Sequence, residues 1–239
     1  GSMATFSELG PNAIALIEAI LAHPSIQACW PMNDASGSIL DRCARSRLTG
    51  TVSGSPTYGV DLGKGFKGLT FAAGSQAISF GDASALRFLW NTPFTFLFVV
   101  KPAFVGGFEY WLSKFDDGGV GWYVAVESGT GIDLYLQAAG ALRVRTNAIP
   151  ANGTLTIFGI TYDGSGAAAG VTFYKDGAVY ADTDINDLLA GGSIANSVAV
   201  RLSRASASGV TCSQGILAIF NAVLTAREMR NFAHLGGFL

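Results

Sequence analysis

The sequence predicts an all-β protein, a two-sheet antiparallel jelly-roll sandwich with a short N-terminal helix and a short C-terminal helix. Three observations lead to this prediction. After Pro24 the apolar runs are short, and several alternate with polar residues, as half-buried antiparallel strands do. Gly, Asp, Asn and Ser separate these runs, which is typical of hairpin turns. No helical pattern alternates with the strands, so a parallel βαβ arrangement is not expected.

The first expected element is a helix over residues 13–22. Ile14, Ile17 and Leu21 fall at helical spacing, and Pro24 enforces the end of the helix. A helix this short is marginal on its own, so its apolar stripe needs a surface to lie on.

Strands are expected next, bounded by turn residues and rich in aromatic and β-branched side chains. Hairpin signals follow three of them, at residues 128–131, 163–166 and Asp176-Gly177. The clearest expected strands are 76–81, 94–101, 109–115, 121–128, 132–138, 141–147, 154–163, 171–177, 198–204 and 215–222.

A second helix is expected over residues 224–235. Thr225 suits the N-cap, Glu228 three residues later completes a capping box, and Gly236-Gly237 ends the helix. This pattern places the last helix directly after the last expected strand.

We expect one domain, because no linker, repeat or low-complexity block divides the 239 residues. Residues 1–3 are typical of an expression-tag remnant, residues 4–24 form an N-terminal helical arm, and residues 25–239 form the sandwich. Residues 4–10 lack the basic start and apolar stretch of a signal peptide. This favours a protein released by cell lysis, such as a virion component, or an extracellular protein whose signal has been removed.

The composition argues against two classes of partner. Charged residues make up 13% of the chain and the net charge is −2, which offers no basic surface for nucleic acid. The longest apolar run, 94–100, is too short to insert into a membrane as a helix. A surface rich in small polar residues is instead typical of extracellular β proteins and of subunits that bury area against neighbours.

The cysteines Cys29, Cys43 and Cys212 have no metal-type spacing. We expect reduced, partly buried thiols, since free cysteine behaves as a small apolar residue. The alternative is a Cys29–Cys43 disulfide, because these two flank the turn at Ser36-Gly37.

Five motifs in order carry a resemblance to a known family. They are the run from Trp30 to Gly37 with Asp41 and Gly50-Thr51, then 76–88 with 93–102, 111–126, 157–180 and 201–229. The chain resembles the laminin-G-like, concanavalin A-like lectin and glucanase jelly rolls found in bacterial secreted and bacteriophage virion proteins. The likeness spans roughly residues 20 to 232. It implies the sandwich fold and leaves function open, since one fold hosts many activities.

The stretch 28–42 concentrates Trp, Cys, Asp and Asn, yet it is expected to be scaffold. Trp30 and Met32, two residues apart, share a face and should pack into the sandwich. Asp34 and Ser36 suit a turn stabilised by hydrogen bonds from side chain to backbone.

The resemblance also brings a hydrolase into consideration as a distant alternative. Glucanases with this fold carry two Glu flanking an Asp on one strand face, and none of the five Glu here falls in such a pattern. The nearest acidic pair, Glu127 and Asp133, could face each other across a hairpin. His23 and His234 suit helix C-termini. We therefore do not expect an enzyme.

Aromatic and acidic residues on neighbouring strands suggest a glycan site, because rings stack on sugars and polar groups fix hydroxyls. On 121–128, Tyr123 lies on the face opposite Trp122, which makes Tyr123 the better surface candidate. Asp116 and Asp117 could hold Ca²⁺ with carbonyls of the following glycines, or could simply form a turn. The candidate ligand residues are Trp111, Asp116, Asp117, Tyr123 and Arg143.

Two hypotheses follow. The first is a non-catalytic recognition module on a virion or in the extracellular space, binding a cell-surface glycan. The second is a purely structural, self-associating virion protein that forms a homo-oligomer and contacts other virion subunits. The second hypothesis rests on the low charge and on the apolar N-terminal helix, which would be available for docking.

Overall fold

The computed structural model describes residues 8–72, 75–116, 118–127, 130–189, 191–202 and 211–239. The two α-helices are α1 (Pro11–Ala22) and α2 (Ala226–Leu235). Single turns of 3-10 helix lie at Ser84–Leu86 and Ala168–Gly170. The strands are β1 (Ile26–Pro31), β2 (Thr51–Ser53), β3 (Thr57–Gly63), β4 (Phe66–Phe71), β5 (Ala77–Gly81), β6 (Phe94–Pro102), β7 (Phe108–Phe115), β8 (Gly121–Glu127), β9 (Gly131–Gln137), β10 (Ala141–Thr146), β11 (Thr156–Tyr162), β12 (Val171–Lys175), β13 (Ala178–Tyr180), β14 (Asp182–Asp187), β15 (Val200–Leu202) and β16 (Cys212–Phe220).

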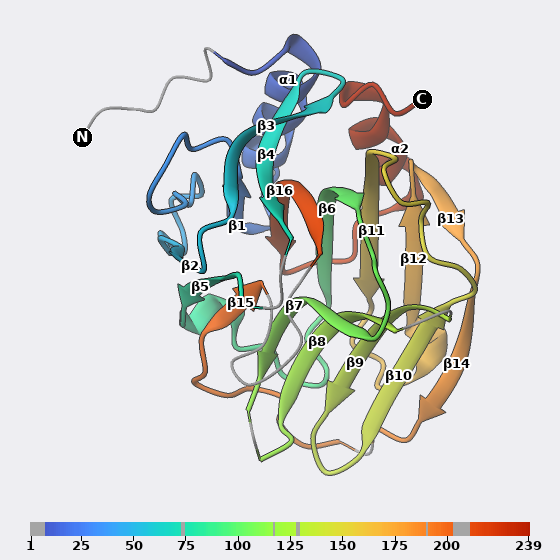
Figure 1. Cartoon of the computed structure of the whole chain (residues 1–239). Helices are drawn as coiled ribbons and strands as arrows, with labels where there is room; N and C mark the ends of the chain where they lie inside the picture. The colour runs from blue at the N-terminus through green and yellow to red at the C-terminus, as the bar shows by residue number, and fades with distance from the viewer. Residues whose placement is uncertain (1–7, 73–74, 117, 128–129, 190, 203–210) are drawn as a thin grey trace.

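The strands form two antiparallel sheets, and the predicted sandwich is confirmed (Figure 1). One sheet has the order β13-β12-β11-β6-β16-β4-β3, with β1 also paired to β16. We call it the helix-covered sheet. The other has the order β14-β10-β9-β8-β7-β15-β5-β2, and we call it the open sheet. Every expected strand is present within the described residues.

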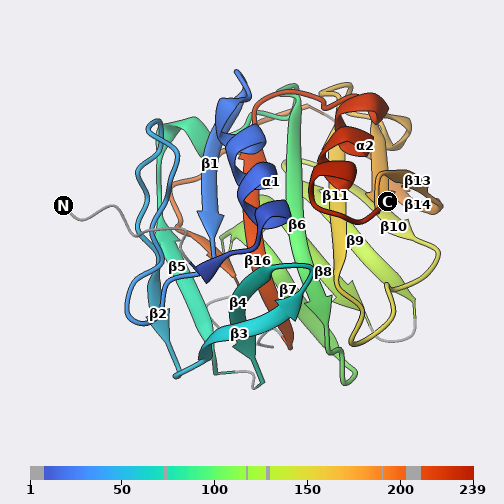
Figure 2. The same cartoon turned by 90° about the horizontal axis from the view of Figure 1, so that it is seen from above.

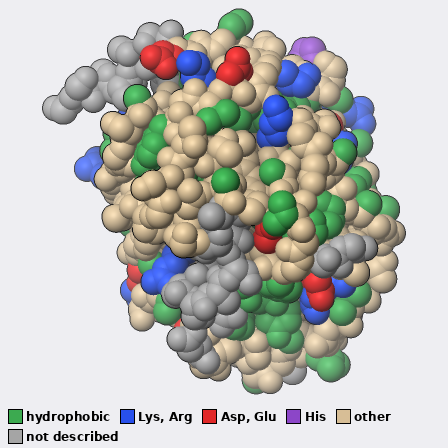
Figure 3. Space-filling model, in the orientation of Figure 1, with side chains coloured by type: hydrophobic (Ala, Val, Ile, Leu, Met, Phe, Trp, Pro, Cys, Tyr) green, Lys and Arg blue, Asp and Glu red, His purple; other side chains and the backbone are tan. Residues whose placement is uncertain are grey.

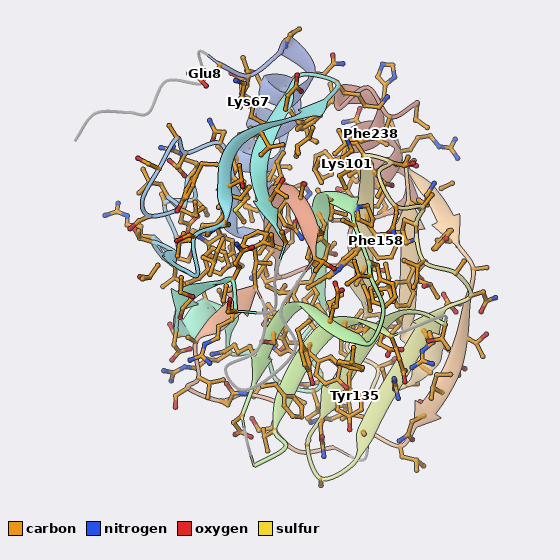
Figure 4. The ribbon with its side chains drawn as sticks, in the orientation of Figure 1. Glu8, Lys67, Lys101, Tyr135, Phe158 and Phe238 are labelled. Atoms are coloured by element: carbon orange, nitrogen blue, oxygen red, sulfur yellow. The ribbon has the colours of Figure 1, made fainter. Side chains whose placement is uncertain are left out.

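The core between the sheets is built from aromatic side chains that alternate inward along the strands. The Trp30 ring stacks on Phe80 with centroids 4.1 Å apart, and the Phe96 and Trp122 centroids are 4.7 Å apart. Phe158 on β11 lies among these buried rings (Figure 4). Burial of these rings removes a large apolar area from water and so favours folding.

The stretch 28–42 is scaffold, as predicted. Trp30 and Met32 are fully buried, and the Trp30 indole N–H donates to the Leu48 carbonyl at 2.7 Å. Asp34 accepts the Leu40 backbone N–H, which closes the turn. Asp41 fastens the return segment by accepting backbone N–H groups from Cys29, Cys43 and Leu48.

Both α-helices lie on the outer face of the helix-covered sheet (Figure 2). Helix α1 begins at Pro11, because proline fits the first helical turn. Its apolar residues Ala13, Leu16, Ile17 and Ile20 are buried against this sheet and the residues around α2. The expectation that this helix is free to dock onto other subunits is therefore wrong, since its apolar stripe is already covered within the chain.

Helix α2 carries the predicted capping box. The Thr225 side chain accepts the Glu228 backbone N–H, and the Glu228 carboxylate accepts the Thr225 backbone N–H at 2.7 Å. The other Glu228 oxygen accepts from His23 Nε2 at 3.1 Å. His23 follows the end of α1, so this bond joins the two helices.

The three cysteines are free and buried, which confirms the prediction of reduced thiols. Burial is the largest effect on the Cys29 and Cys212 thiols, and it raises the pKa of both well above the ordinary value. Within the described residues, no helix has the length and apolar character needed to cross a membrane. The face in Figure 3 consists mainly of uncharged polar and backbone atoms, with Lys, Arg, Asp and Glu scattered singly or in small groups.

Candidate ligand-binding face

An aromatic and charged surface lies on the outer side of the open sheet, across β7 to β10. Strand pairing sets its layout, because directly opposed residues share a face. One cross-strand row runs Tyr123, Tyr135, Arg143. The next row runs Tyr110, Ala125, Asp133, Arg145. We call this surface the β7–β10 face and define it by Phe108, Tyr110, Phe115, Tyr123, Glu127, Asp133, Tyr135, Arg143 and Arg145.

The aromatic half of the β7–β10 face is a cluster centred on Tyr123. The Tyr123 ring is nearly parallel to Tyr135, with centroids 4.7 Å apart and 17° between the planes. Tyr110 and Phe115 meet the Tyr123 ring edge-on at 5.1 and 5.4 Å. Tyr123 is only 9% exposed, whereas Tyr135 is half-buried. Tyr135, marked in Figure 4, is therefore the tyrosine of the stacked pair that a ligand can reach.

Both stacked tyrosines stay in the neutral phenol form around neutral pH. Burial is the largest effect on each, and it raises the pKa of both phenols despite the nearby positive charge of Arg143. The Tyr135 hydroxyl donates to Gln137 Oε1 at 3.0 Å. This bond fixes the rotation of the hydroxyl and leaves the ring as the ligand-facing part.

The charged half of the β7–β10 face is a four-residue network. Arg143 Nη2 lies 2.6 Å from both Glu127 Oε2 and Asp133 Oδ2. Arg145 Nε lies 2.6 Å from Asp133 Oδ1, and Arg145 Nη2 also donates to Glu127 Oε2. Two guanidinium groups thus face two carboxylates, and their formal charges cancel. The hydrogen bond from Arg145 to Asp133 outweighs partial burial and raises the pKa of this guanidinium.

The four side chains of the network are buried to different extents. The Asp133 side chain has no exposed surface, and both of its oxygens accept from guanidinium groups. Side-chain exposure is 14% for Arg145, 23% for Arg143 and 37% for Glu127. In the described structure Glu127 Oε1 accepts no hydrogen bond. A ligand therefore meets guanidinium donors beside one free carboxylate oxygen, which suits neighbouring hydroxyl groups.

Two of the predicted ligand residues come together on this face. Tyr123 lies on β8 and Arg143 on β10, and Tyr135 on β9 lies between them. The pairing also shows that Glu127 and Asp133 do lie on one side of the hairpin, but as partners of the arginines. Asp133 has no surface through which to reach a substrate, so the pair does not form a two-carboxylate hydrolase site.

Trp111 was expected on the ligand surface, and this prediction is wrong. Its side chain is 1% exposed, and its ring packs between the sheets 6.1 Å from Phe98 and 6.2 Å from Phe158. The cause is a β-bulge between Tyr110 and Leu112. A bulge adds a residue and breaks strict alternation, so Tyr110 faces outward while Trp111 and Leu112 both join the core.

Asp116 forms a turn. Its side chain accepts the Val120 backbone N–H at 2.8 Å, and its backbone N–H donates to the Val120 carbonyl at 3.0 Å. Asp117 lies outside the described residues. Nowhere in the described ranges do three or more His, Cys, Asp or Glu side chains gather at metal-binding distance.

Sequence reasoning missed Phe108 and Tyr110, which complete the aromatic cluster. Trp111 was selected on this strand from the sequence, and Tyr110, which faces outward, was not considered. Arg143 and Arg145 alternate on one strand, and this alternation was the sequence signal available for the charged network.

No family model matches the sequence, and no curated protein matches it. Solved structures share its fold. The botulinum neurotoxin serotype G binding domain matches with a TM-score of 0.65 and 16% identity, over 88% of this chain and 51% of that chain. A Trypanosoma rangeli sialidase matches with a TM-score of 0.63 and 13% identity, over 89% of this chain and 33% of the sialidase chain.

A third structure is domain 4 of a GH43 extracellular arabinanase from Geobacillus stearothermophilus, in complex with arabinotriose. It matches with a TM-score of 0.60 and 16% identity, over 87% of this chain and 98% of that domain. The chain therefore spans about half of the toxin binding domain and a third of the sialidase, but nearly all of the arabinanase domain. At these identities the matches show a shared fold.

Proposed function

We propose that the protein is a non-catalytic recognition module that binds a carbohydrate on the β7–β10 face. The observation that carries the proposal is the parallel Tyr123–Tyr135 pair next to the charge-balanced network of Glu127, Asp133, Arg143 and Arg145. Protein sites for small ligands combine apolar rings with a few convergent polar groups. The accessible Tyr135 ring supplies the apolar surface, and Arg143 with Glu127 supplies donors and an acceptor.

The charge balance favours a neutral sugar. An acidic sugar would bring a carboxylate next to Glu127, whose charge repels it, and would find both guanidiniums already paired. Neighbouring hydroxyls of a neutral sugar can accept from Arg143 and donate to Glu127 Oε1 without breaking an ion pair. The arabinotriose complex of the arabinanase domain supports carbohydrate as the ligand class, because that domain matches this chain over nearly its whole length.

A neutral glycan panel tests the proposal. Wild-type protein should give saturable binding by calorimetry to at least one member, and Tyr135→Ala should weaken it by about tenfold, since a lost ring contact costs on the order of 1 kcal/mol beyond area burial. Tyr58→Ala, a tyrosine far from this face in the strand order, is the matched control and should bind normally. Absence of binding across the panel would remove the proposal.

We propose further that the module works as a symmetric homo-oligomer on a virion or in another extracellular assembly, where a cell-surface glycan is within reach. Exposed apolar side chains support self-association. Val179 on β13, Ile185 on β14 and Leu188 just beyond are 65%, 47% and 70% exposed. β13 is an edge strand of the helix-covered sheet and β14 an edge strand of the open sheet. The two edges lie on the same side of the molecule (Figures 1 and 2).

Light scattering over a range of protein concentrations tests this second proposal. An oligomer should dissociate on dilution, and Val179→Ser with Leu188→Ser should favour the monomer because less apolar area is available for burial. A strict monomer at every concentration would leave the recognition module intact and remove the assembly.

A further inference from the structure

A groove with a volume of about 520 Å³ lies on the solvent-facing side of α2, and its lining includes two arginines. It lies at the helix-covered sheet, away from the β7–β10 face. Its lining residues are Arg227, Glu228, Arg230, Asn231, His234 and Leu239.

Helix geometry places the polar side chains of the groove together. Arg227 and Asn231, like Arg230 and His234, are four residues apart, so each pair stacks along one side of the helix. Arg227 and Arg230 are three apart and are also neighbours. The helix that carries them is held rigidly, since Met229, Phe232 and Ala233 are buried beneath it and the capping box fixes its first turn.

The basic groups of the groove are not neutralised. In the part of the chain that the structure describes, the side chains of Arg227, Arg230, Asn231 and His234 form no ion pair or hydrogen bond. The single acid in the lining, Glu228, is occupied, because its oxygens accept from Thr225 and His23. The two guanidinium groups therefore have no ion-pair partner among the described residues, and the Glu228 carboxylate adds one negative charge to the groove.

We propose that this groove binds a sulfate or phosphate ester carried on a saccharide. Guanidinium groups recognise tetrahedral oxyanions through paired N–H donors, and two of them one helical turn apart can hold the same group. The Asn231 amide and the His234 imidazole add donors. The groove has the size of a small-molecule site, larger than a bare oxyanion needs, and Leu239 offers an apolar wall to the carbon skeleton of the ligand.

The two surfaces select different ligands. On the β7–β10 face every guanidinium is paired with a carboxylate, which suits a neutral sugar, whereas the α2 groove presents guanidiniums without a carboxylate partner. The groove can thus act independently of the proposed function and add a preference for charged glycans.

The experiment titrates the full chain with a sulfated disaccharide, the phosphate ester of the same sugar, the neutral parent sugar and inorganic sulfate, followed by NMR. The Asn231 side-chain amide and the His234 imidazole should shift saturably with both esters. Affinity should fall at least about tenfold in the Arg227→Gln/Arg230→Gln variant, because two charge-assisted contacts are lost. Arg45→Gln/Arg47→Gln is the charge-matched control, since both arginines are exposed in the loop before β2, and it should bind as wild type does.

Several outcomes would overturn the proposal. One is the absence of saturable shifts at α2, and another is an equal loss of affinity in Arg45→Gln/Arg47→Gln, which would mean unspecific charge attraction. Equal affinity for inorganic sulfate and the sulfated sugar would show an adventitious ion only. Tyr135→Ala keeps the two sites distinguishable, because it should weaken neutral-sugar binding by about tenfold and leave the α2 shifts unchanged.

Discussion

Tyr123 lies 4.7 Å from Tyr135 in a nearly parallel stack, yet the two rings have different roles. Tyr123 also contacts Phe108, Tyr110 and Phe115, so it is the centre of the cluster. Tyr135 lies at its accessible margin. Tyr123→Ala should lower the free energy of unfolding by about 3 kcal/mol, the usual cost of removing a buried aromatic ring. Tyr135→Ala should lower the free energy of unfolding by about 1 kcal/mol or less but weaken ligand binding by about tenfold. Urea unfolding and calorimetry on both variants check this, and a similar stability loss in both would contradict the assigned roles.

Glu127 should set the charge preference of the β7–β10 face. Glu127→Gln removes one of the two carboxylates that balance Arg143 and Arg145, leaving one excess positive charge near the surface. The variant should therefore gain binding to sugars that carry a carboxylate, by about threefold to tenfold at low salt, and this gain should shrink as salt is added. Titration of the wild type and the variant with a neutral sugar and its uronic acid measures the change. An unchanged ratio of the two affinities would argue against a role for Glu127.

Lys114 and Asp82 form a nearly buried ion pair that should make stability depend on pH. Lys114 is 1% exposed, and its Nζ lies 2.6 Å from Asp82 Oδ1. Hydrogen bonds from Arg87 and Lys114 hold the pKa of the Asp82 carboxyl below its ordinary value, despite some burial. Because the pKa of Asp82 is lower in the folded state, the ion pair contributes its full stability above the unfolded-state pKa of about 4. This contribution is lost as the pH falls from that value through the folded-state pKa.

Asp82→Asn should therefore cost about 3 kcal/mol at neutral pH, because Lys114 is left without its buried partner. At pH 3 the difference from wild type should shrink. Urea unfolding at both pH values provides the measurement. Asp184→Asn, on the exposed edge strand β14, is the control and should stay within about 0.5 kcal/mol of wild type.

Helix α1 should contribute to stability although it lies outside the sandwich. Leu16 is fully buried between the helix and the helix-covered sheet. Leu16→Ala should cost about 3 kcal/mol through lost burial and the remaining cavity. Glu18→Ala, on the exposed side of the same helix, should change stability by less than about 0.5 kcal/mol. Thermal unfolding of both variants decides, and equal melting temperatures would mean that the helix is a loosely attached arm.

The cysteines should react only after unfolding. Cys29 and Cys212 are fully buried, and burial raises the pKa of their thiols, so neither the access nor the thiolate needed for reaction is present. A disulfide-exchange reagent should label no cysteine of the native protein within minutes and all three in concentrated denaturant. Rapid labelling of Cys29 in the native state would contradict this packing.

The sequence was informative wherever local patterns decide structure. Alternation located the long central strands, and the Thr225–Glu228 spacing located the capping box of α2 because capping is a local interaction. Strands β2, β3, β4, β13 and β14 were not predicted. Most residues of β2, β3, β13 and β14 are exposed, so these four strands carry little apolar alternation, and their pairing depends on distant partners. Strand β4 is mostly buried but does not alternate strictly.

The candidate site was predictable in composition but not in layout. Tyr123 and Arg143 could be selected because alternation turned them away from the core. Trp111 could not be placed correctly, since a bulge has no reliable local signal and shifts the facing of the residues after it. The network around Asp133 needed the register of β8, β9 and β10, which only the folded sheet reveals.

Both helices lie on one sheet, so the two outer faces of the sandwich differ: one carries the helices and the other carries the β7–β10 face. The first and last described elements lie on the side opposite the β7–β10 face (Figure 2). Attachment through either end, whether to a bead, a fluorophore or a neighbouring domain, should therefore orient the tyrosines and arginines toward the medium. Arrays of tethered copies would present these surfaces side by side, and weak individual contacts would then add up to firm adhesion.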